Sequence, residues 1–423
     1  MSIKGVKQDY IISNKVDDYS NESLSISFDT FKKAINTSNE VLELDSMCEN
    51  PSNLDNYNSM RDLFDKKFDV SDLPYYDDRH RYRFQGFTVT KDFIYITAHG
   101  GKNDPSVILV YDKEGNYLGQ VKLPTGGGKN SHVGGISYDS EHDILYLTST
   151  NGKVLVINNK YLANIFKDNS TRNDSPFNIN LDDEEDFDLN SFVIDETSID
   201  IKRDFDKYLK DHSIDSYNSN IQDDWFHEML EDANVIENKA SLNASSVYYD
   251  EINHKLYVPT FSRDSKIFVY DVSFDEEGNP IYTFKDIYGI GSSSDIKIDD
   301  VNLPYGIQGV ATYTDPNGDT YLLMVSSFGT IDSTIAKYKI KEDGSLEFAG
   351  QHIFYGKKGL ENIVVDPKTG DIFCNFENYA GGTDNDGGNF ESIHVDDING
   401  SNNDYRYLDI MRKMYGSSSD YER

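Results

Sequence analysis

Cysteine is scarce in this chain: Cys48 and Cys374 are the only two among 423 residues. Two cysteines cannot build a disulfide framework or a thiolate zinc site, so no such scaffold is implied. Long apolar runs are missing as well, since no stretch approaches the ~20 residues of a membrane-spanning helix. The first residues contain no apolar segment of signal-peptide length. We therefore expect no membrane insertion, and the sequence by itself favours a cytoplasmic location.

Basic residues are outnumbered in this acidic protein, with 40 Lys and Arg against 74 Asp and Glu and a net charge of −34. Affinity for nucleic acid comes mainly from Lys and Arg that neutralise phosphates. Anionic lipid surfaces attract the same residues. The composition therefore predicts no nucleic-acid partner and no peripheral membrane binding, and a protein partner steered by this charge would be basic.

Aromatic residues are abundant, with 30 Tyr and 23 Phe, and they favour β-structure. One three-strand pattern occurs five times, and its first strands are FQGF from Phe84, VGGI from Val133, ASSV from Ala244, IQGV from Ile307 and LENI from Leu360. Antiparallel units repeated around a circle make a β-propeller. We therefore predict an all-β fold, a five-bladed β-propeller, with six blades as the alternative.

The repeat also carries signals for the centre and the closure of the ring. Small residues follow the polar position of the first strands, at Gly86, Gly135, Ser246 and Gly309, as expected where innermost strands crowd around a channel. The segment KKFDVSDLP, residues 66–74, has the pattern of a strand that closes the ring from the N-terminal side. Closure would remove an open sheet edge.

Spacing between the repeats locates an insertion. Gly134 and Ser245 are 111 residues apart, whereas 49 to 63 residues separate the other neighbouring pairs. The excess falls in residues 161–240, which hold 21 acidic and 7 basic residues, a charge of −14. We interpret this segment as an acidic appendage with two or three short helices that can be removed while the ring stays folded. The domains expected are then a polar N-terminal arm at 1–62, helical or disordered in part, the propeller at 63–404 and a tail at 405–423.

Several blade segments resemble a known group of proteins. HVGGISYDSEHDILYLTSTNGKV from His132 and GLENIVVDPKTGDIFCNFENYA from Gly359 resemble β-propeller proteins of low-GC Gram-positive bacteria, which are usually exported. The second segment is also distantly similar to esterase-like and phytase-like propellers. The resemblance implies a propeller fold and an extracellular or cell-surface location.

The candidate site is a ring of equivalent first-strand positions, held by Gln85, Gly134, Ser245, Gln308 and Glu361, with His132 two residues before Gly134. We predict a ligand site from Gln85, His132, Ser245, Gln308 and Glu361, with Glu361 and His132 as catalytic candidates. Glu361 has no cationic partner in this ring, and a buried unpaired charge is costly. Gln85 and Gln308 could equally satisfy backbone groups, and His132 could be a turn residue. The ends of the second strands, among them His99 and Glu377, are expected nearer the opposite mouth or further out in the blades.

The metal and cofactor signals are weaker. Asp384, Asp386 and Glu391 in TDNDGGNFE are spaced loosely like a calcium loop, but the flanking helices and the carboxylate at the twelfth position are missing. A polar hairpin explains the segment as well. Calcium or magnesium is therefore the only cofactor that the sequence suggests, and no other is indicated.

Two functions fit these observations. The leading hypothesis is a non-enzymatic propeller that binds a protein or glycan partner, with the insertion shaping the recognised face, because no nucleophile motif or zinc pattern is present in the sequence. The alternative is a divalent-cation-dependent hydrolase of a phosphoester, lactone or glycoside at the channel mouth. Whether the protein is an enzyme therefore stays open, and the balance favours binding.

Overall fold

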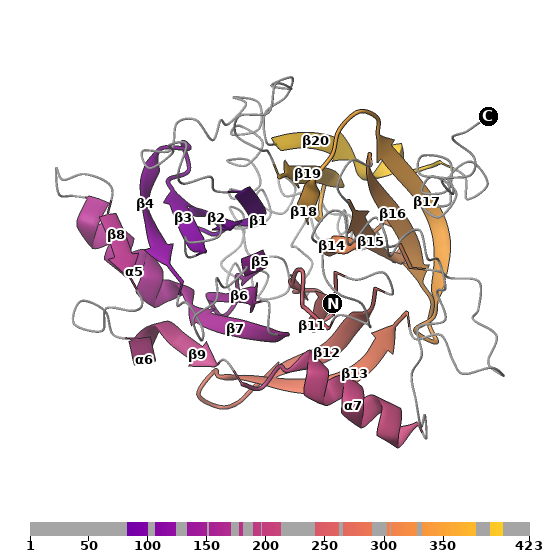
Figure 1. Ribbon diagram of the computed structural model, residues 1–423, viewed down its shortest axis with the longest axis horizontal. Helices are drawn as coiled ribbons and strands as arrows, with labels where there is room; N and C mark the ends of the chain where they lie inside the picture. Colours follow the sequence, from indigo (N-terminus) through magenta and orange to yellow (C-terminus); the bar gives the residue numbers. More distant parts are fainter. Residues whose placement is uncertain are drawn as a thin grey trace, which may run out of the picture.

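The computed structural model describes residues 83–99, 106–123, 133–149, 152–170, 177–180, 189–195, 197–212, 242–261, 265–289, 303–304, 306–327, 332–377 and 390–400. The described strands form five sheets arranged around a ring, and Figure 1 looks down its centre. The prediction of a five-bladed β-propeller is confirmed. The proposed closing strand at 66–74 and the expected boundaries at 62/63 and 404/405 lie outside the described residues.

Blades 1 and 2 come first along the chain and lie side by side (Figure 1). Blade 1 consists of β1 (Arg83–Val89), β2 (Ile94–His99), β3 (Val107–Tyr111), β4 (Tyr117–Lys122) and, parallel to β4, β8 (Phe177–Asn180). Blade 2 consists of β5 (Val133–Asp139), β6 (Ile144–Ser149), β7 (Lys153–Asn158) and β9 (Val193–Asp195).

Blades 3 to 5 complete the ring. Blade 3 consists of β10 (Tyr248–Asp250), β11 (Lys255–Pro259), β12 (Ile267–Phe274) and β13 (Pro280–Tyr288). Blade 4 consists of β14 (Ile307–Thr314), β15 (Thr320–Ser326), β16 (Ser333–Ile340) and β17 (Leu346–Phe354). Blade 5 consists of β18 (Leu360–Val365), β19 (Asp371–Phe376) and β20 (Phe390–His394), followed by a 3-10 turn at Val395–Asp397.

Hairpin turns between the strands follow from short polar side chains that bind their own backbone. Asp315 accepts hydrogen bonds from the backbone N–H groups of Asn317 and Asp319, both at 2.9 Å. Gly318 in the same turn has a φ of +88°, a conformation that a side chain disfavours. The same arrangement of Asp and Asn closes the turn between β12 and β13 at Asp275 and Asn279. These turns close the hairpins of blades 3 and 4 in the register that the strands adopt.

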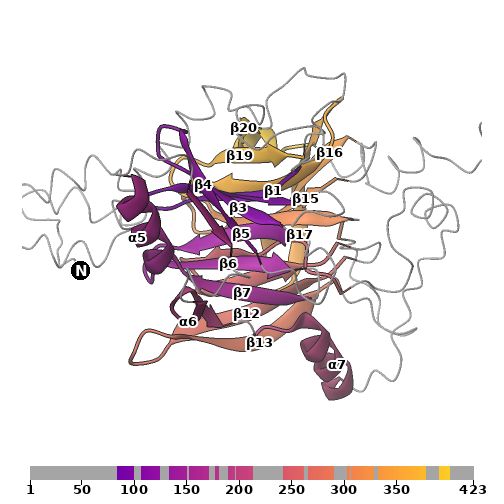
Figure 2. The same ribbon diagram turned by 60° about the vertical axis from the view of Figure 1, so that its left-hand side comes forward.

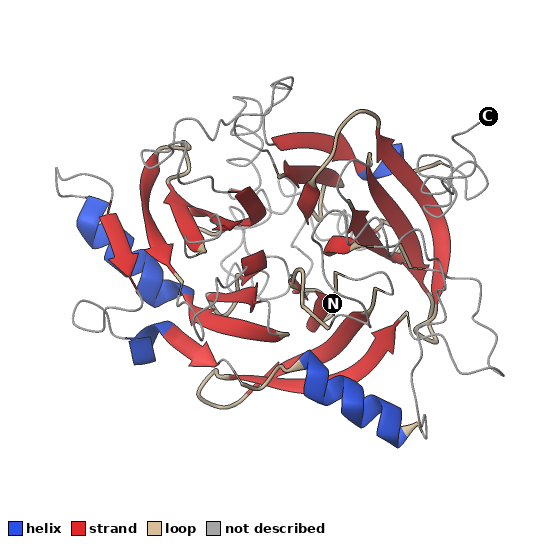
Figure 3. Ribbon diagram, in the orientation of Figure 1, coloured by secondary structure: helices blue, strands red, loops and turns tan. Residues whose placement is uncertain are grey.

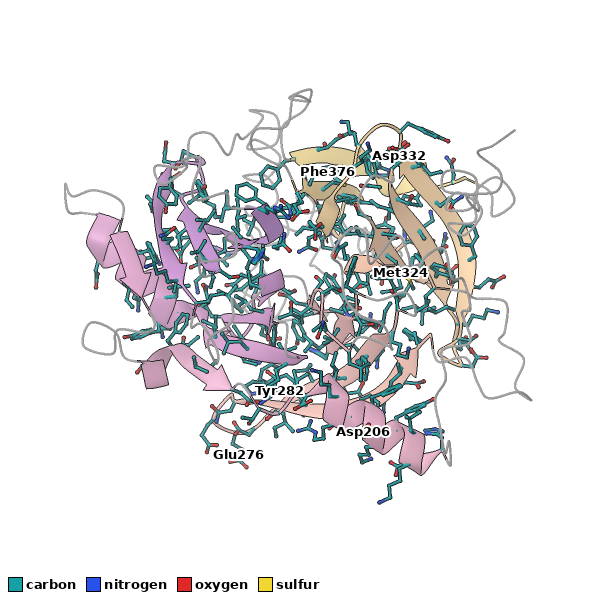
Figure 4. The ribbon with its side chains drawn as sticks, in the orientation of Figure 1. Asp206, Glu276, Tyr282, Met324, Asp332 and Phe376 are labelled. Carbon is teal, nitrogen blue, oxygen red and sulfur yellow. The ribbon has the colours of Figure 1, made fainter. Side chains whose placement is uncertain are left out.

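The hydrophobic core is divided among the interfaces of the blades, where side chains fill the space between neighbouring sheets (Figure 4). Between blades 1 and 5, for example, the Phe390 ring meets the rings of Phe84 at 5.8 Å and Phe87 at 5.5 Å. Blades 4 and 5 share a separate core in which the rings of Phe354 and Phe376 lie 5.4 Å apart. Each blade is therefore stabilised mainly by its neighbours, so the ring is expected to unfold as one unit.

The inserted segment forms part of this core, contrary to our expectation of a removable appendage. Its described part forms α5 (Asn159–Ser170), α6 (Leu189–Phe192) and α7 (Ile201–Asp211) on the outer rim (Figures 2 and 3). It also supplies β9, which pairs with β7 as the fourth strand of blade 2, and β8 of blade 1. The alternative of a sixth blade was wrong, because the described part of residues 161–240 extends existing blades.

The two longer helices are fixed by specific contacts. Phe166 of α5 packs on Phe93 of blade 1, with ring centroids 6.3 Å apart. Helix α7 begins at Asp200, whose side chain accepts hydrogen bonds from two backbone N–H groups of the first turn. Asp204 is buried and accepts a 2.9 Å hydrogen bond from the Tyr270 hydroxyl of blade 3. The insertion thus spans the rims of blades 1, 2 and 3.

Among the described residues, no helix has both the length and the apolar character needed to cross a membrane.

Candidate functional site

All five blades carry a one-residue irregularity at the same place, between the first and second strands. In blade 5, Leu360 pairs with Phe376 but Asn362 pairs with Asn375, so Glu361 is an extra residue in β18. The same shift occurs at Gln85, at Gly134–Gly135 and at Gln308. In blade 3 it falls between Ala244 and Tyr248, the stretch that contains Ser245.

Bulges of this kind change the direction of a side chain and are frequent next to functional sites. Their positions coincide with the ring of residues that the repeat alignment selected. The repeat alignment thus selected the bulged positions, although the sequence gave no sign that the backbone is bulged there.

The first strands crowd together as predicted. A Cβ atom added at Gly86 would lie 2.7 Å from the Cα of Gly135, and one added at Gly135 would lie 2.0 Å from the Ser246 hydroxyl oxygen. One added at Gly309 would lie 2.9 Å from the carbonyl oxygen of Glu361. Such distances leave no room for a side chain, so small residues are needed at this level.

Glu361 is the acid among the ring of first-strand positions and is buried, with 6% of its surface exposed. The side-chain amide of Gln308 donates a 3.2 Å hydrogen bond to its Oε1. Burial raises the pKa of Glu361 well above its usual value, the negative charge of Glu377 raises it further, and Arg83 opposes both effects. A carboxyl in this setting retains its proton to higher pH than an exposed one.

Glu377 follows the last residue of β19 and is the second carboxyl of the site. Its Oε1 lies 3.5 Å from Nη1 of Arg83 and accepts a 3.4 Å hydrogen bond from the side-chain amide of Gln85. Burial raises the pKa of Glu377, while Arg83 and the hydrogen bond from Gln85 oppose that rise. Of the two acids, Glu377 therefore has the direct support for its ionised form.

The expectation that the second-strand ends lie nearer the opposite mouth was wrong. Arg83, the first residue of β1, pairs with His99, the last residue of β2. The backbone N–H of Glu377 likewise donates to the carbonyl oxygen of Gly359, just before β18. Because the strands are antiparallel, the start of the first strand meets the end of the second at one mouth of the ring.

We call Arg83, Gln85, Gln308, Glu361 and Glu377 the mouth cluster. It joins blade 5 to its two neighbours, blades 1 and 4, at the strands nearest the centre (Figure 1). Figure 4 labels Phe376, the last residue of β19 before Glu377, on blade 5. The side chains of Arg83 and Glu377 are 37% and 18% exposed, so solvent reaches the cluster at one side.

Sequence reasoning missed Arg83 and Glu377 as members of this cluster. It treated the repeats as separate rows of equivalent residues, and Glu377 belongs to a different row from Glu361. The signal that would have found the pair is the register of the hairpin between the first and second strands, read from its turn.

His99 lies beside the mouth cluster, opposite Arg83. Burial lowers the pKa of its imidazole, and the positive charge of Arg83 lowers it further. A neutral imidazole is therefore favoured at this position.

The remaining predicted residues are placed as follows. The Ser245 hydroxyl lies 2.7 Å from the Ile307 carbonyl oxygen and 3.2 Å from that of Pro259, so it bonds to backbone and connects blades 3 and 4. Glu391 of β20 forms an ion pair with Lys357. His132, Asp384 and Asp386 lie outside the described residues.

Within the part of the chain that the structure describes, no group of three or more His, Cys, Asp or Glu residues is arranged to hold a metal ion.

Fold and site together define a class, a five-bladed propeller with a polar cluster at its central mouth. No known family model matches the chain, and no curated protein matches it. Among solved structures, it is similar to a chain of the mitotic checkpoint complex, at 10% identity and a TM-score of 0.31 over 71% of this chain and 59% of that one.

Two bacterial structures are similar at the same level. A putative 6-phosphogluconolactonase from Bacteroides uniformis is 12% identical, with a TM-score of 0.33 over 74% of this chain and 71% of that one. A protein of unknown function from Bacteroides thetaiotaomicron is 14% identical, with a TM-score of 0.33 over 73% and 58%. The present chain spans less than two thirds of the first and last of these three chains.

Proposed function

We propose that the protein binds a glycan at the mouth cluster. The observation that carries this proposal is the convergence of one guanidinium, two side-chain amides and two carboxyls from three blades, with hydrogen bonds among them. Sugar hydroxyls both donate and accept hydrogen bonds, and this cluster offers both kinds of group. A hydroxyl-rich ligand would replace the water that reaches Arg83 and Glu377.

A glycan fits the cluster better than a protein partner does. A protein interface of ordinary size buries about 800 Å² on each side. The mouth cluster is small and largely buried, since only 4% of Gln85 and 6% of Glu361 are exposed. The described part of the insertion lies on the outer rim, so it supports no role in shaping the mouth (Figure 3). The resemblance to exported bacterial propellers also supports a glycan ligand, because an exported protein would meet the glycans of the cell surface.

Arg83→Ala should weaken glycan binding about 10- to 100-fold, because a hydrogen bond to a charged group contributes roughly 1.5–3 kcal/mol. The measurement is a screen of immobilised oligosaccharides with the wild-type chain, followed by calorimetric titration of the best ligand. Lys285→Ala, which removes a positive charge from the outer strand of blade 3, is the matched control and should bind normally. A wild-type chain that retains no oligosaccharide would contradict the proposal.

A divalent-cation-dependent hydrolase is the second candidate, in line with the resemblance to esterase-like and phytase-like propellers. The observation that favours it is the pair of neighbouring carboxyls with two amide side chains beside them. Carboxylate and amide oxygens are the ligands that calcium and magnesium prefer. A cation between Glu361 and Glu377 would also neutralise their mutual repulsion.

Calcium or magnesium should then raise the Tm of the wild-type chain by several degrees. At a concentration one hundred times Kd the ligand contributes about 2.7 kcal/mol to the free energy of unfolding. Differential scanning calorimetry with each ion, and with potassium as the control, measures the shift. The shift should disappear in Glu361→Gln. An unchanged Tm with both ions would contradict the hypothesis of a cation-dependent hydrolase, whereas the proposal of glycan binding would not be affected.

A further inference from the structure

We infer that the mouth cluster hydrolyses a glycosidic bond of the glycan it binds, with Glu361 as the proton donor and Glu377 as the base. This inference rests on the proposed glycan binding and adds an activity to it. Three observations carry it: the two carboxyls are neighbours, they have different hydrogen-bond partners, and among the described residues Glu377 alone of the two contacts a cation.

The contacts of Glu361 locate its proton. The amide N–H of Gln308 donates to Oε1 at 3.2 Å, so Oε1 takes the role of the carbonyl oxygen in the neutral acid. The proton then belongs on Oε2. Gln308 is therefore a positioning residue, which fixes the acid in one orientation without touching the reacting bond.

The contacts of Glu377 prepare it for the opposite role. Arg83 and Gln85 both contact its Oε1, at 3.5 and 3.4 Å. Among the described residues, these contacts leave Oε2 to accept a proton from a water molecule. Burial raises the pKa of both carboxyls, but the direct contacts of Arg83 and Gln85 oppose that rise at Glu377, and such a difference between two neighbouring acids suits general acid–base catalysis.

The reaction balances without any other reactant than water. Glu361 Oε2 gives its proton to the glycosidic oxygen while the bond from that oxygen to the anomeric carbon breaks, and the bonding electrons stay on the departing oxygen. A water oxygen forms the new bond to the anomeric carbon, and the water's proton passes to Glu377 Oε2. The proton then returns from Glu377 to Glu361 through solvent, which restores the starting state.

The experiment incubates the full-length chain with a library of reducing-end-labelled oligosaccharides and follows chain length by chromatography. Wild type should both retain and shorten a subset. Glu361→Gln should retain the same subset but cleave it about 10²- to 10⁴-fold more slowly, the usual contribution of a positioned acid. Retention without cleavage by the wild type would overturn the inference while glycan binding stands. If nothing is retained, the proposed function fails and this inference with it.

Gln308→Leu separates a positioning role from a merely structural one. Removal of a donor that stabilises the ionised form of Glu361 should raise its pKa, so the alkaline limb of the pH–rate profile should move to higher pH while the rate falls. Within the described ranges, the charged groups that act on Glu361 are Glu377 and Arg83, and both remain in this variant. An unchanged alkaline limb with a lower rate would contradict the proton assignment.

A thermal measurement tests the same assignment without any substrate. The folded-state pKa of Glu361 lies above its unfolded value, so the wild type loses stability as the pH rises from the unfolded pKa to the folded one. Glu361→Gln has no such loss, and its Tm relative to wild type should be higher at pH 8 than at pH 4. A difference in Tm that does not change with pH would overturn the assignment.

Discussion

A chain that lacks residues 161–240 should fail to fold into a stable ring. The deletion removes β9, α7 and most of α5, and with them Phe166 and Phe192 from the core of blades 1 and 2 and Phe205 from the core of blades 2 and 3. Loss of one buried Phe side chain typically costs about 3–5 kcal/mol, and whole domains are stable by only about 5–15 kcal/mol. Circular dichroism melts and size-exclusion chromatography of the truncated chain would show the loss.

Point variants on α7 make the same test in a chain of full length. The Phe205 ring packs on that of Phe268 in blade 3, with centroids 6.3 Å apart. Phe205→Ala should lower the free energy of unfolding by about 3–5 kcal/mol. Lys210→Ala on the exposed side of the same helix is the matched control and should change it by less than about 0.5 kcal/mol. A truncated chain that melts like the wild type would restore the interpretation of 161–240 as an appendage.

The sequence predicted the ring because each blade repeats the same local signals, namely Tyr-rich strands and Asp- or Gly-containing turns. It failed for β9 because that strand has three residues, begins 35 positions beyond the end of β7, and takes a place that is decided by packing. No periodic pattern is visible over Val193–Asp195. A long insertion in a propeller sequence can therefore contain a short strand that pairs with the preceding blade, as β9 pairs with β7 here.

The candidate site was predicted in part for a similar reason. Gln85, Gln308 and Glu361 were found because they are equivalent positions of a repeat, and all three belong to the mouth cluster. Ser245 occupies the same position, but its short side chain reaches only backbone carbonyl groups. The contact between Glu361 and the charges of Glu377 and Arg83 depends on strand register and on the order of blades around the ring, which a comparison of repeats does not contain.

Gly134→Ala should destabilise the protein strongly for a purely steric reason. The added Cβ would lie 1.9 Å from the carbonyl oxygen of Ser245 and 2.5 Å from the hydroxyl oxygen of Thr148. The strands of blades 2 and 3 must then separate, which breaks the 3.1 Å hydrogen bond from the Gly135 N–H to the Ser245 carbonyl. Overpacking costs about 1–3 kcal/mol and an unsatisfied buried group costs about as much again. We therefore expect a loss of about 2–6 kcal/mol, measured as a lower urea midpoint.

Gly318→Asn is the appropriate control for that measurement. Nothing lies within 4 Å of a Cβ added at Gly318, and asparagine tolerates its φ of +88° better than other residues do. Its urea midpoint should stay close to that of the wild type. Equal midpoints for the two variants would mean that the first strands can move apart freely. In that case the crowding at the centre would not hold the first strands of blades 2 and 3 together.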